Sequence, residues 1–193
     1  MRIALTGRRN IVVLMLAGAM AGCGGAGTID QTSVSPISNE ATFATLGYLW
    51  DGVRSAIVAK REPAVGPFNL VLHYEPPCSR GGSGSYKGSV TGTKTSTGGT
   101  GTLSMTATIS ACQYDDNVVI TTITASDLTA TGTIAIVNDT WGNIDIHMVA
   151  TNVTVNGVVC PGGVDVHLTG LTPSTPPIST GTACGRTGAV PLP

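Results

Sequence analysis

Residues 102–111 have the sequence TLSMTATISA, and this stretch decides the fold class. Apolar and hydroxyl-bearing side chains alternate along it without exception. Successive side chains of a β-strand point to opposite faces, so this period of two predicts a strand with one buried face and one face in water. Ala107 and Ala111 belong to the apolar set, and we expect their small side chains to let a helix lie close to the sheet.

The same pattern continues on both sides of this stretch. Short segments rich in Gly, Asn, Asp, Ser and Pro separate the predicted strands, which cover residues 69–75, 85–94, 102–111, 118–125, 128–137, 144–154, 158–168 and 178–184. About eight strands with short connections predict a mainly β fold, namely an antiparallel meander, a sandwich or a partly open barrel. The abundant threonines agree, because β-branched side chains suit a pleated surface.

One amphipathic helix is predicted ahead of the strands, over residues 39–60. Its apolar side chains recur at spacings of three and four residues and form one stripe: Phe43, Leu46, Trp50, Val53 and Ile57. Ser38 is placed to cap the start, Lys60 and Arg61 suit the last turn, and Pro63 ends the helix. We expect the stripe to pack on the apolar face of the sheet.

Composition limits the classes of protein that the chain can be. It has 193 residues, which suits a single domain, here expected over residues 39–193. Lys and Arg together number 10, Asp and Glu 11, and only 4% of residues are aromatic. Because there is no basic surplus and little aromatic material for stacking, we expect no nucleic-acid partner. The hydrophobic content of 41% argues against wholesale disorder.

The N-terminus has the pattern of a secretory signal peptide. Arg2, Arg8 and Arg9 precede an apolar run over residues 11–21. This run is shorter than the roughly 20 residues that a membrane-spanning helix needs. A charged start, a short apolar run and small residues at its end predict a cleaved signal over residues 1–22.

The end of that signal, Met20-Ala21-Gly22-Cys23, resembles the lipobox of bacterial lipoproteins. The resemblance implies cleavage before Cys23 and attachment of acyl chains to this cysteine. The protein would then be held at the membrane through a lipid anchor. Gly24 rather than Asp follows the cysteine, which in a Gram-negative cell implies the outer membrane. Residues 23–38 are then the lipidated cysteine and a flexible tether, because they are small and polar without periodicity.

The other four cysteines predict two disulfides. An even number of cysteines in an exported chain indicates a disulfide framework, and four cysteines allow three connectivities. We favour Cys78–Cys112 and Cys160–Cys184, because each pair brackets one predicted hairpin. A zinc site is disfavoured, since no two of these cysteines have the close spacing of a metal knuckle.

A repeated D-x-H pattern is the candidate constellation for chemistry in this sequence. Asp145-Ile-His147 and Asp165-Val-His167 lie on two predicted strands with Asn156-Gly157 midway between them. A three-residue loop would set Ile146 opposite Val166, with Asp145 facing His167 and His147 facing Asp165. We interpret these as two cross-strand Asp–His pairs on a wet face. A metal site on the four side chains is the less favoured reading, because opposed side chains on a flat sheet converge poorly.

Motifs of catalysis and cofactor binding are not found in the sequence. There is no G-x-S-x-G elbow and no Walker lysine, and the glycines over residues 81–88 do not lead into a helix. We therefore predict no catalytic residue, no enzymatic activity and no cofactor. The expected function is a structural or interaction role in the bacterial cell envelope, with envelope proteins as partners. The alternative is a carrier that holds a small apolar ligand between the helix and a curved sheet.

Overall fold

The structure is a computed structural model, and it describes residues 28–29, 35–60, 63–115, 120–137, 139–170 and 177–191. The predicted signal peptide over residues 1–22 and the predicted lipidation site Cys23 lie outside these residues. Among the described residues, no helix combines the length and the apolar character needed to cross a membrane.

The fold is mainly β, with one helix ahead of most of the strands. The helix is α1 (Asn39–Val58). The strands are β1 (Thr28–Ile29), β2 (Gly66–Tyr74), β3 (Ser83–Lys94), β4 (Gly98–Asp115), β5 (Ile120–Val137), β6 (Thr140–Ala150), β7 (Val153–Val155), β8 (Val158–Val159), β9 (Val164–Gly170), β10 (Ile178–Ala183) and β11 (Arg186–Pro191).

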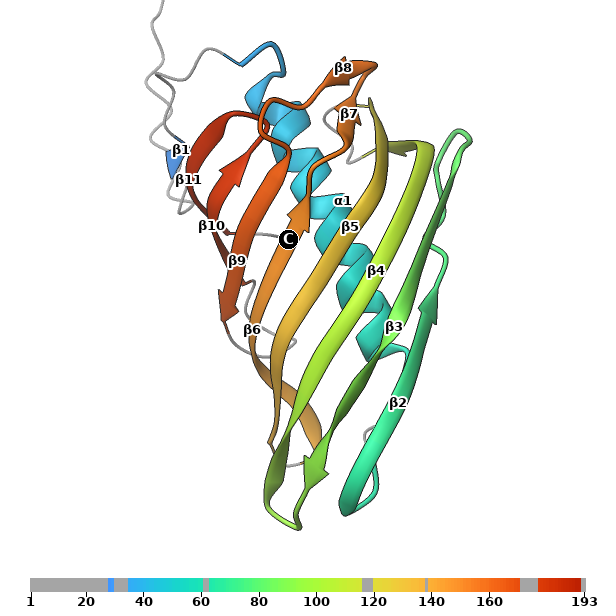
Figure 1. Cartoon of the computed structure of the whole chain (residues 1–193), viewed down its shortest axis with the longest axis vertical. Coiled ribbons are helices and arrows are strands. Elements are labelled where there is room, and N and C mark those ends of the chain that lie inside the picture. The colour runs from blue at the N-terminus through green and yellow to red at the C-terminus, as the bar shows by residue number, and fades with distance from the viewer. Residues whose placement is uncertain are drawn as a thin grey trace, which may run out of the picture.

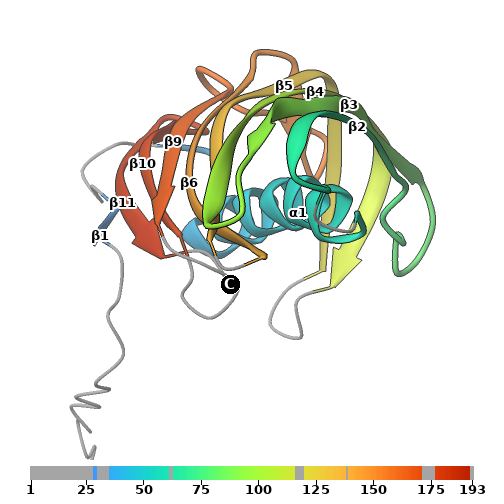
Figure 2. The ribbon, with the colours of Figure 1, turned by 90° about the horizontal axis from the view of Figure 1, so that it is seen from below.

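All strands belong to one antiparallel sheet with the order β1-β11-β10-β9-β6-β5-β4-β3-β2, while the short β7–β8 hairpin lies beside β5. From β2 to β11 the main path is a meander in which each strand pairs with the next along the chain, except that β6 pairs with β9 because β7 and β8 are inserted between them. The sheet curls into an open trough, and α1 lies along its inside (Figures 1 and 2). This arrangement confirms the predicted fold class and selects the open meander.

The start of α1 is as predicted, but its end is earlier. The backbone N–H of Ala41 donates to the Ser38 hydroxyl at 3.2 Å. Glu40 lies in the first turn, where hydrogen bonding from the backbone and from Ser38 lowers the pKa of its carboxyl. The helix ends at Val58 rather than at residue 60, because the N–H of Lys60 bonds to Ile57 in a tighter turn. The expected basic last turn is therefore wrong.

The helix is buried on more than the predicted stripe. Leu46, Trp50, Val53 and Ile57 are buried as expected, whereas Phe43 is only partly covered. Small residues between them are buried too, because the sheet arches over the helix instead of lying flat against one side (Figure 2).

Close approach between α1 and β3 depends on Gly52. A Cβ atom at this position would lie 2.1 Å from Cζ of Tyr86. The Tyr86 ring is 0% exposed, so it packs flat against the bare helix backbone. Gly52 therefore lowers the intrinsic stability of the helix, but it permits this contact with Tyr86.

Strand β4 supplies the middle of the core, with Leu103, Met105, Ala107 and Ile109 buried as the alternation predicts. Ala111 does not continue the apolar face: it is exposed, has a left-handed φ of 45° and lies at a register shift before Cys112. A β-bulge at this point transfers the inward position from Ala111 to Cys112. The expectation for Ala111 is therefore wrong.

Several strand boundaries also differ from the predictions. The predicted strands over 118–125 and 128–137 form one bent strand, β5, while the predicted strand over 144–154 is divided between β6 and β7. Strands β1 and β11 were not predicted. Because Thr28–Ile29 pair with β11 and Ile37 is 4% exposed, these parts of the proposed flexible tether are ordered against the domain.

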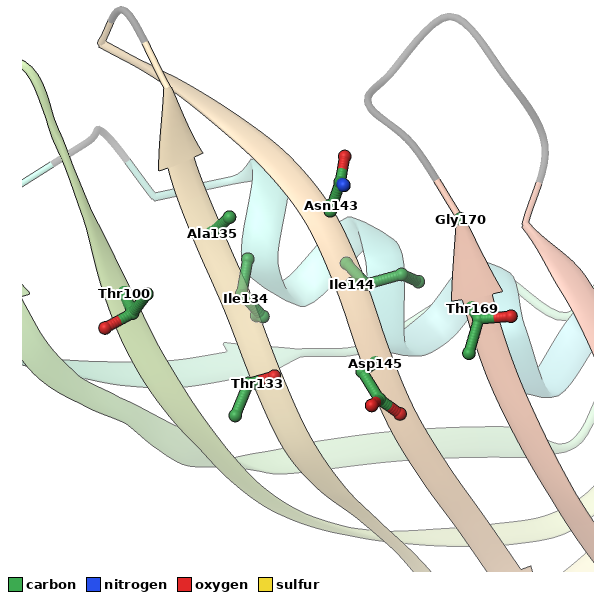
Figure 3. Close-up of a pocket in the computed structure, with 9 residues that line it drawn as sticks. All are labelled: Thr100, Thr133, Ile134, Ala135, Asn143, Ile144, Asp145, Thr169 and Gly170. Carbon is green, nitrogen blue, oxygen red and sulfur yellow. The ribbon is translucent and has the colours of Figure 1, made fainter.

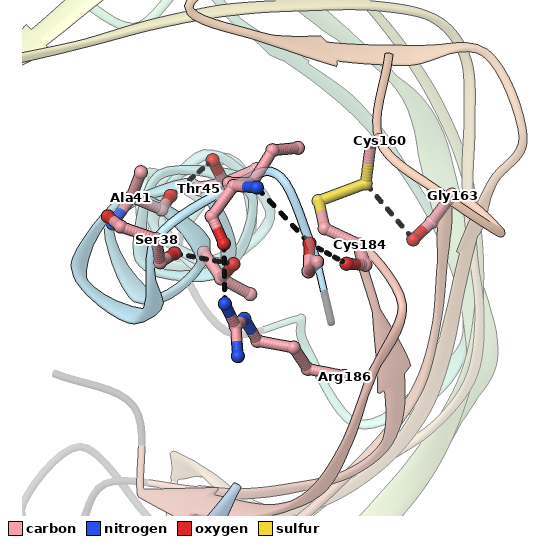
Figure 4. The surroundings of a disulfide bond; sticks show 10 residues. Ser38, Ala41, Thr45, Cys160, Gly163, Cys184 and Arg186 are labelled. Carbon is pink, nitrogen blue, oxygen red and sulfur yellow. Dashed lines mark hydrogen bonds between the residues drawn. A yellow bond between two sulfur atoms is a disulfide. The ribbon is translucent and has the colours of Figure 1, made fainter. Parts of the chain in front are cut away.

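Both disulfides join the favoured partners, Cys78 with Cys112 and Cys160 with Cys184. The second bond lies beside the start of the helix (Figure 4). The Ser35 hydroxyl donates to the carbonyl of Cys184 at 2.7 Å, and the Arg186 guanidinium donates to the carbonyl of Ile37 at 2.6 Å. This end of the sheet therefore fixes the segment that enters α1. Two disulfides also indicate an extracytoplasmic protein.

Candidate functional site

The convex face of the sheet is exposed and is not used by the core. Every outward position of β4 from Thr100 to Ser110 is an exposed threonine or serine. The register continues these hydroxyls across neighbouring strands, as in the row Thr91–Thr102–Thr133. The alternation that places apolar side chains of β4 on the concave face therefore also places an uncharged array of hydroxyls on its convex face.

The row that contains the D-x-H residues crosses β6 and β9 on this same face. His147 lies directly opposite His167, and the two imidazole rings stack with centroids 4.4 Å apart and planes 6° apart. Nε2 of His147 lies 2.7 Å from a carboxylate oxygen of Asp165, whereas Nδ1 of His167 lies 4.0 Å from Asp145. The expected Asp–His partners thus come together, but along diagonals.

The predicted register was wrong by two residues, although the predicted face was right. Ile146 pairs with Leu168 instead of Val166, so the apolar face stays apolar. Asn156-Gly157 is the tight turn of the separate β7–β8 hairpin, with positive φ at both residues, and does not join β6 to β9. This inserted hairpin changes the offset between the longer strands.

The four side chains do not form a metal cage. Stacking places the imidazoles parallel, and Nε2 of His147 is directed to Asp165. Within the described part of the chain, no group of three or more His, Cys, Asp or Glu side chains is placed to hold a metal ion. The exposed fractions of the four side chains run from 38% for His147 to 69% for Asp145, which fits ion pairs in water.

A hollow of about 450 Å³ adjoins this row, and Asp145 belongs to both (Figure 3). In the register, Asp145 lies between Thr133 on β5 and Thr169 on β9. The lining residues are Thr100, Thr133, Ile134, Ala135, Asn143, Ile144, Asp145, Thr169 and Gly170. Hydroxyls, one amide and one carboxylate can accept and donate hydrogen bonds to a polar partner.

Sequence reasoning missed Asp127, which organises the bend in β5. Its carboxylate accepts hydrogen bonds from the backbone N–H groups of Thr151 and Asn152 at 3.1 and 3.0 Å, and also from both side chains. Partial desolvation raises the pKa of this carboxyl, but the hydrogen bonds outweigh that effect and the pKa is lowered. An Asp within a threonine-rich strand was the available signal, since Asp is disfavoured in regular strands.

Two buried tyrosines and one buried lysine were also missed, and each has a structural explanation. Burial raises the pKa of Tyr48 on α1 to about 12 and raises the pKa of Tyr86 on β3 well above its ordinary value, so both phenols stay neutral in the core. Nζ of Lys94 donates to the carbonyl of Pro63 at 3.0 Å and pairs with Asp139 at 2.5 Å. This lysine joins the end of β3 to the segment after α1 and to the β5–β6 turn.

Comparison of the chain with protein-family models, with curated proteins and with solved structures found no match. The site is therefore defined by its own geometry: an exposed polar face with stacked histidines and an adjoining hollow, on a sheet whose other face is filled.

Proposed function

We propose that this is a lipid-anchored envelope protein with a non-catalytic interaction role, held at the outer membrane through Cys23 and binding envelope partners through the convex face of its sheet. One observation carries the proposal. The helix occupies the concave face, where Leu49 and Val53 are 0% exposed, while the outward positions of β4 from Thr100 to Ser110 present only hydroxyls on the other face. The surface left for a partner is therefore the polar one.

A carrier of an apolar ligand is less well supported by this packing. Such a protein needs a persistent pocket of roughly 300 Å³ or more between helix and sheet. The void between α1 and strands β9–β11, which Leu46 and Val166 line, is about 10 Å³. A larger groove of about 410 Å³ lies between β2 and α1, but its lining includes the charged side chains of Asp51 and Arg54, which do not suit an apolar ligand. Mass spectrometry of lipids extracted from the purified protein tests this alternative: non-covalent lipid in stoichiometric amount would favour the carrier.

The anchor is tested by mass spectrometry of the N-terminal peptide from membranes of cells that express the full chain. We expect an acylated peptide that begins at Cys23, and its loss in Cys23→Ser. Gly25→Ala, two residues further on, is the matched control and should keep the acylation. An unmodified Cys23 in the wild-type chain would contradict the anchor.

The interaction role is tested by placing a photo-crosslinking residue at single sites of the full chain in cells. Ser104 lies in the middle of the row of hydroxyls on β4, whereas Val159 is 70% exposed and lies on the separate β7–β8 hairpin, which is off the main path of the sheet. We expect discrete crosslinked products from position 104 and none from 159. The same products from both positions, or none from position 104, would contradict the proposal.

A further inference from the structure

The two edges of the sheet differ in how they end. Strand β11 is covered by the two-residue strand β1. Strand β2 pairs with β3 over all nine of its residues, and no strand within the described residues pairs with its other side. An edge of this length presents a row of backbone N–H and C=O groups to which another strand can bond.

The features that usually block such an edge are missing from most of β2. Natural edge strands are protected by charged side chains, by proline or by a bulge. Pro67 lies near the start, but residues 68–74 contain no proline and no Lys, Arg, Asp or Glu. The pairing with β3 runs without a register shift. Val71, in the middle of this stretch, points outward and is 69% exposed.

The inner side of the same edge is incompletely covered. Phe68, Leu70 and Tyr74 face the core from β2 but are only partly buried. Next to them a groove of about 410 Å³ runs between β2 and the second half of α1, with Tyr74 on one side and Asp51 and Arg54 on the other. A strand added to β2 would extend the sheet over this groove and cover these side chains.

We propose that a second copy of this chain occupies the edge, by antiparallel pairing of β2 with β2 of the partner about a two-fold axis perpendicular to the sheet. Such an axis keeps both concave faces on the same side, so residues that face each other have numbers of equal parity. The pairing brings no like charges together across residues 68–74, because this stretch contains no Lys, Arg, Asp or Glu.

The two-fold axis also explains the exposed valine. With the axis near Leu70 or Val71, the Val71 side chains of the two copies lie opposite or diagonal to each other on the convex face. Each would cover the apolar surface of the other. The groove carries one acidic and one basic side chain, Asp51 and Arg54, so two copies of it meet without an excess of one charge.

The test is disulfide crosslinking of the full chain in cells, in the compartment where the native disulfides form. Val71→Cys places a thiol at the proposed two-fold axis. Val159→Cys places one on an equally exposed valine, 70% exposed, on β8. On non-reducing gels we expect a crosslinked dimer from Val71→Cys at least tenfold more abundant than from Val159→Cys.

A charge supplies the second arm of the test. Val71→Lys would set two lysines beside each other at the axis, and sedimentation velocity in detergent should show the wild-type dimer converted to monomer while Val159→Lys stays dimeric. Equal crosslinking at both positions, a wild-type monomer, or a dimer that Val71→Lys leaves intact would overturn the proposal. Crosslinking of Val71→Cys to a different protein would also overturn it and would identify the edge as a site for another partner.

Discussion

The two faces of β6 show how one strand serves two purposes. Ile146 is 0% exposed and faces the core, whereas the adjacent His147 points outward and stacks on His167. Tight packing on the concave side makes the fold sensitive to any change of volume there. The convex side chains are held only by neighbours on the surface, so they are free to vary or to bind.

The largest expected difference between the faces comes from truncating these two neighbours. Ile146→Ala should lower the free energy of unfolding by about 2–5 kcal/mol, because it leaves a cavity in the core. His147→Ala should change it by about 0.5 kcal/mol or less, as is usual for surface sites. Urea denaturation of the two variants measures both values. Equal effects would contradict the division between faces.

A smaller effect tests how closely the helix lies in the trough. In an exposed helix Gly→Ala would stabilise by about 1 kcal/mol. Gly52→Ala should instead destabilise by about 1–3 kcal/mol, because the new Cβ meets the Tyr86 ring.

The same substitution in a Tyr86→Leu background serves as its control. Once the ring is removed, Gly52→Ala should become neutral or stabilising, and thermal unfolding of the four proteins gives this double-mutant cycle. A stabilising Gly52→Ala in the wild-type background would show that the helix stands further from β3.

Asp127 on β5 provides a pH-dependent comparison, because its carboxylate holds Thr151 and Asn152 between β6 and β7. Asp127→Asn should lower the free energy of unfolding by about 1–2 kcal/mol at neutral pH, because the amide cannot accept all the donors of Thr151 and Asn152. The lowered pKa makes the carboxylate's contribution complete above the ordinary Asp value of about 4 and lost as the pH falls through the folded-state pKa.

The difference between wild type and Asp127→Asn should therefore shrink on acidification below about pH 4. Urea denaturation at a series of pH values measures it, with Ser126→Ala as the neighbouring exposed control. A difference that stays constant with pH would mean that the charge of Asp127 does not stabilise the bend.

The smallest expected effect belongs to the histidine row. A double-mutant cycle with His147→Ala and Asp165→Ala should give a coupling of about 0.2–1 kcal/mol, which salt weakens. Chemical denaturation at low and high salt measures it. A coupling several times larger would show that the row is structural and not a free surface.

Local periodicity predicted the parts of this fold that depend on one strand or one helix. The alternation over residues 102–111 gave the buried face of β4, and Ser38 marked the start of α1. The features that the sequence did not predict depend on contacts between distant segments. Ala111 was misplaced because a bulge lies there, and the D-x-H register was missed because β7 and β8 are inserted between β6 and β9.

The residues of the D-x-H row could be predicted from the sequence, but the way in which they face one another could not. Opposite faces follow from the period of two, so Asp145, His147, Asp165 and His167 were correctly placed together on the wet face. Which histidine faces which residue depends on the offset between β6 and β9, and no single segment encodes it. Strand β1 pairs only because β11 is present, so its two residues carry no signal of their own.

We infer that α1 is a permanent part of the core and not a lid over a binding cavity. Amide hydrogen exchange of the intact chain, followed by mass spectrometry, tests it most directly. We predict that peptides from residues 39–58 exchange as slowly as those from residues 102–109 of β4, because both open only when the whole domain unfolds. Exchange of the helix well before β4 would show that it opens locally, and would contradict the account.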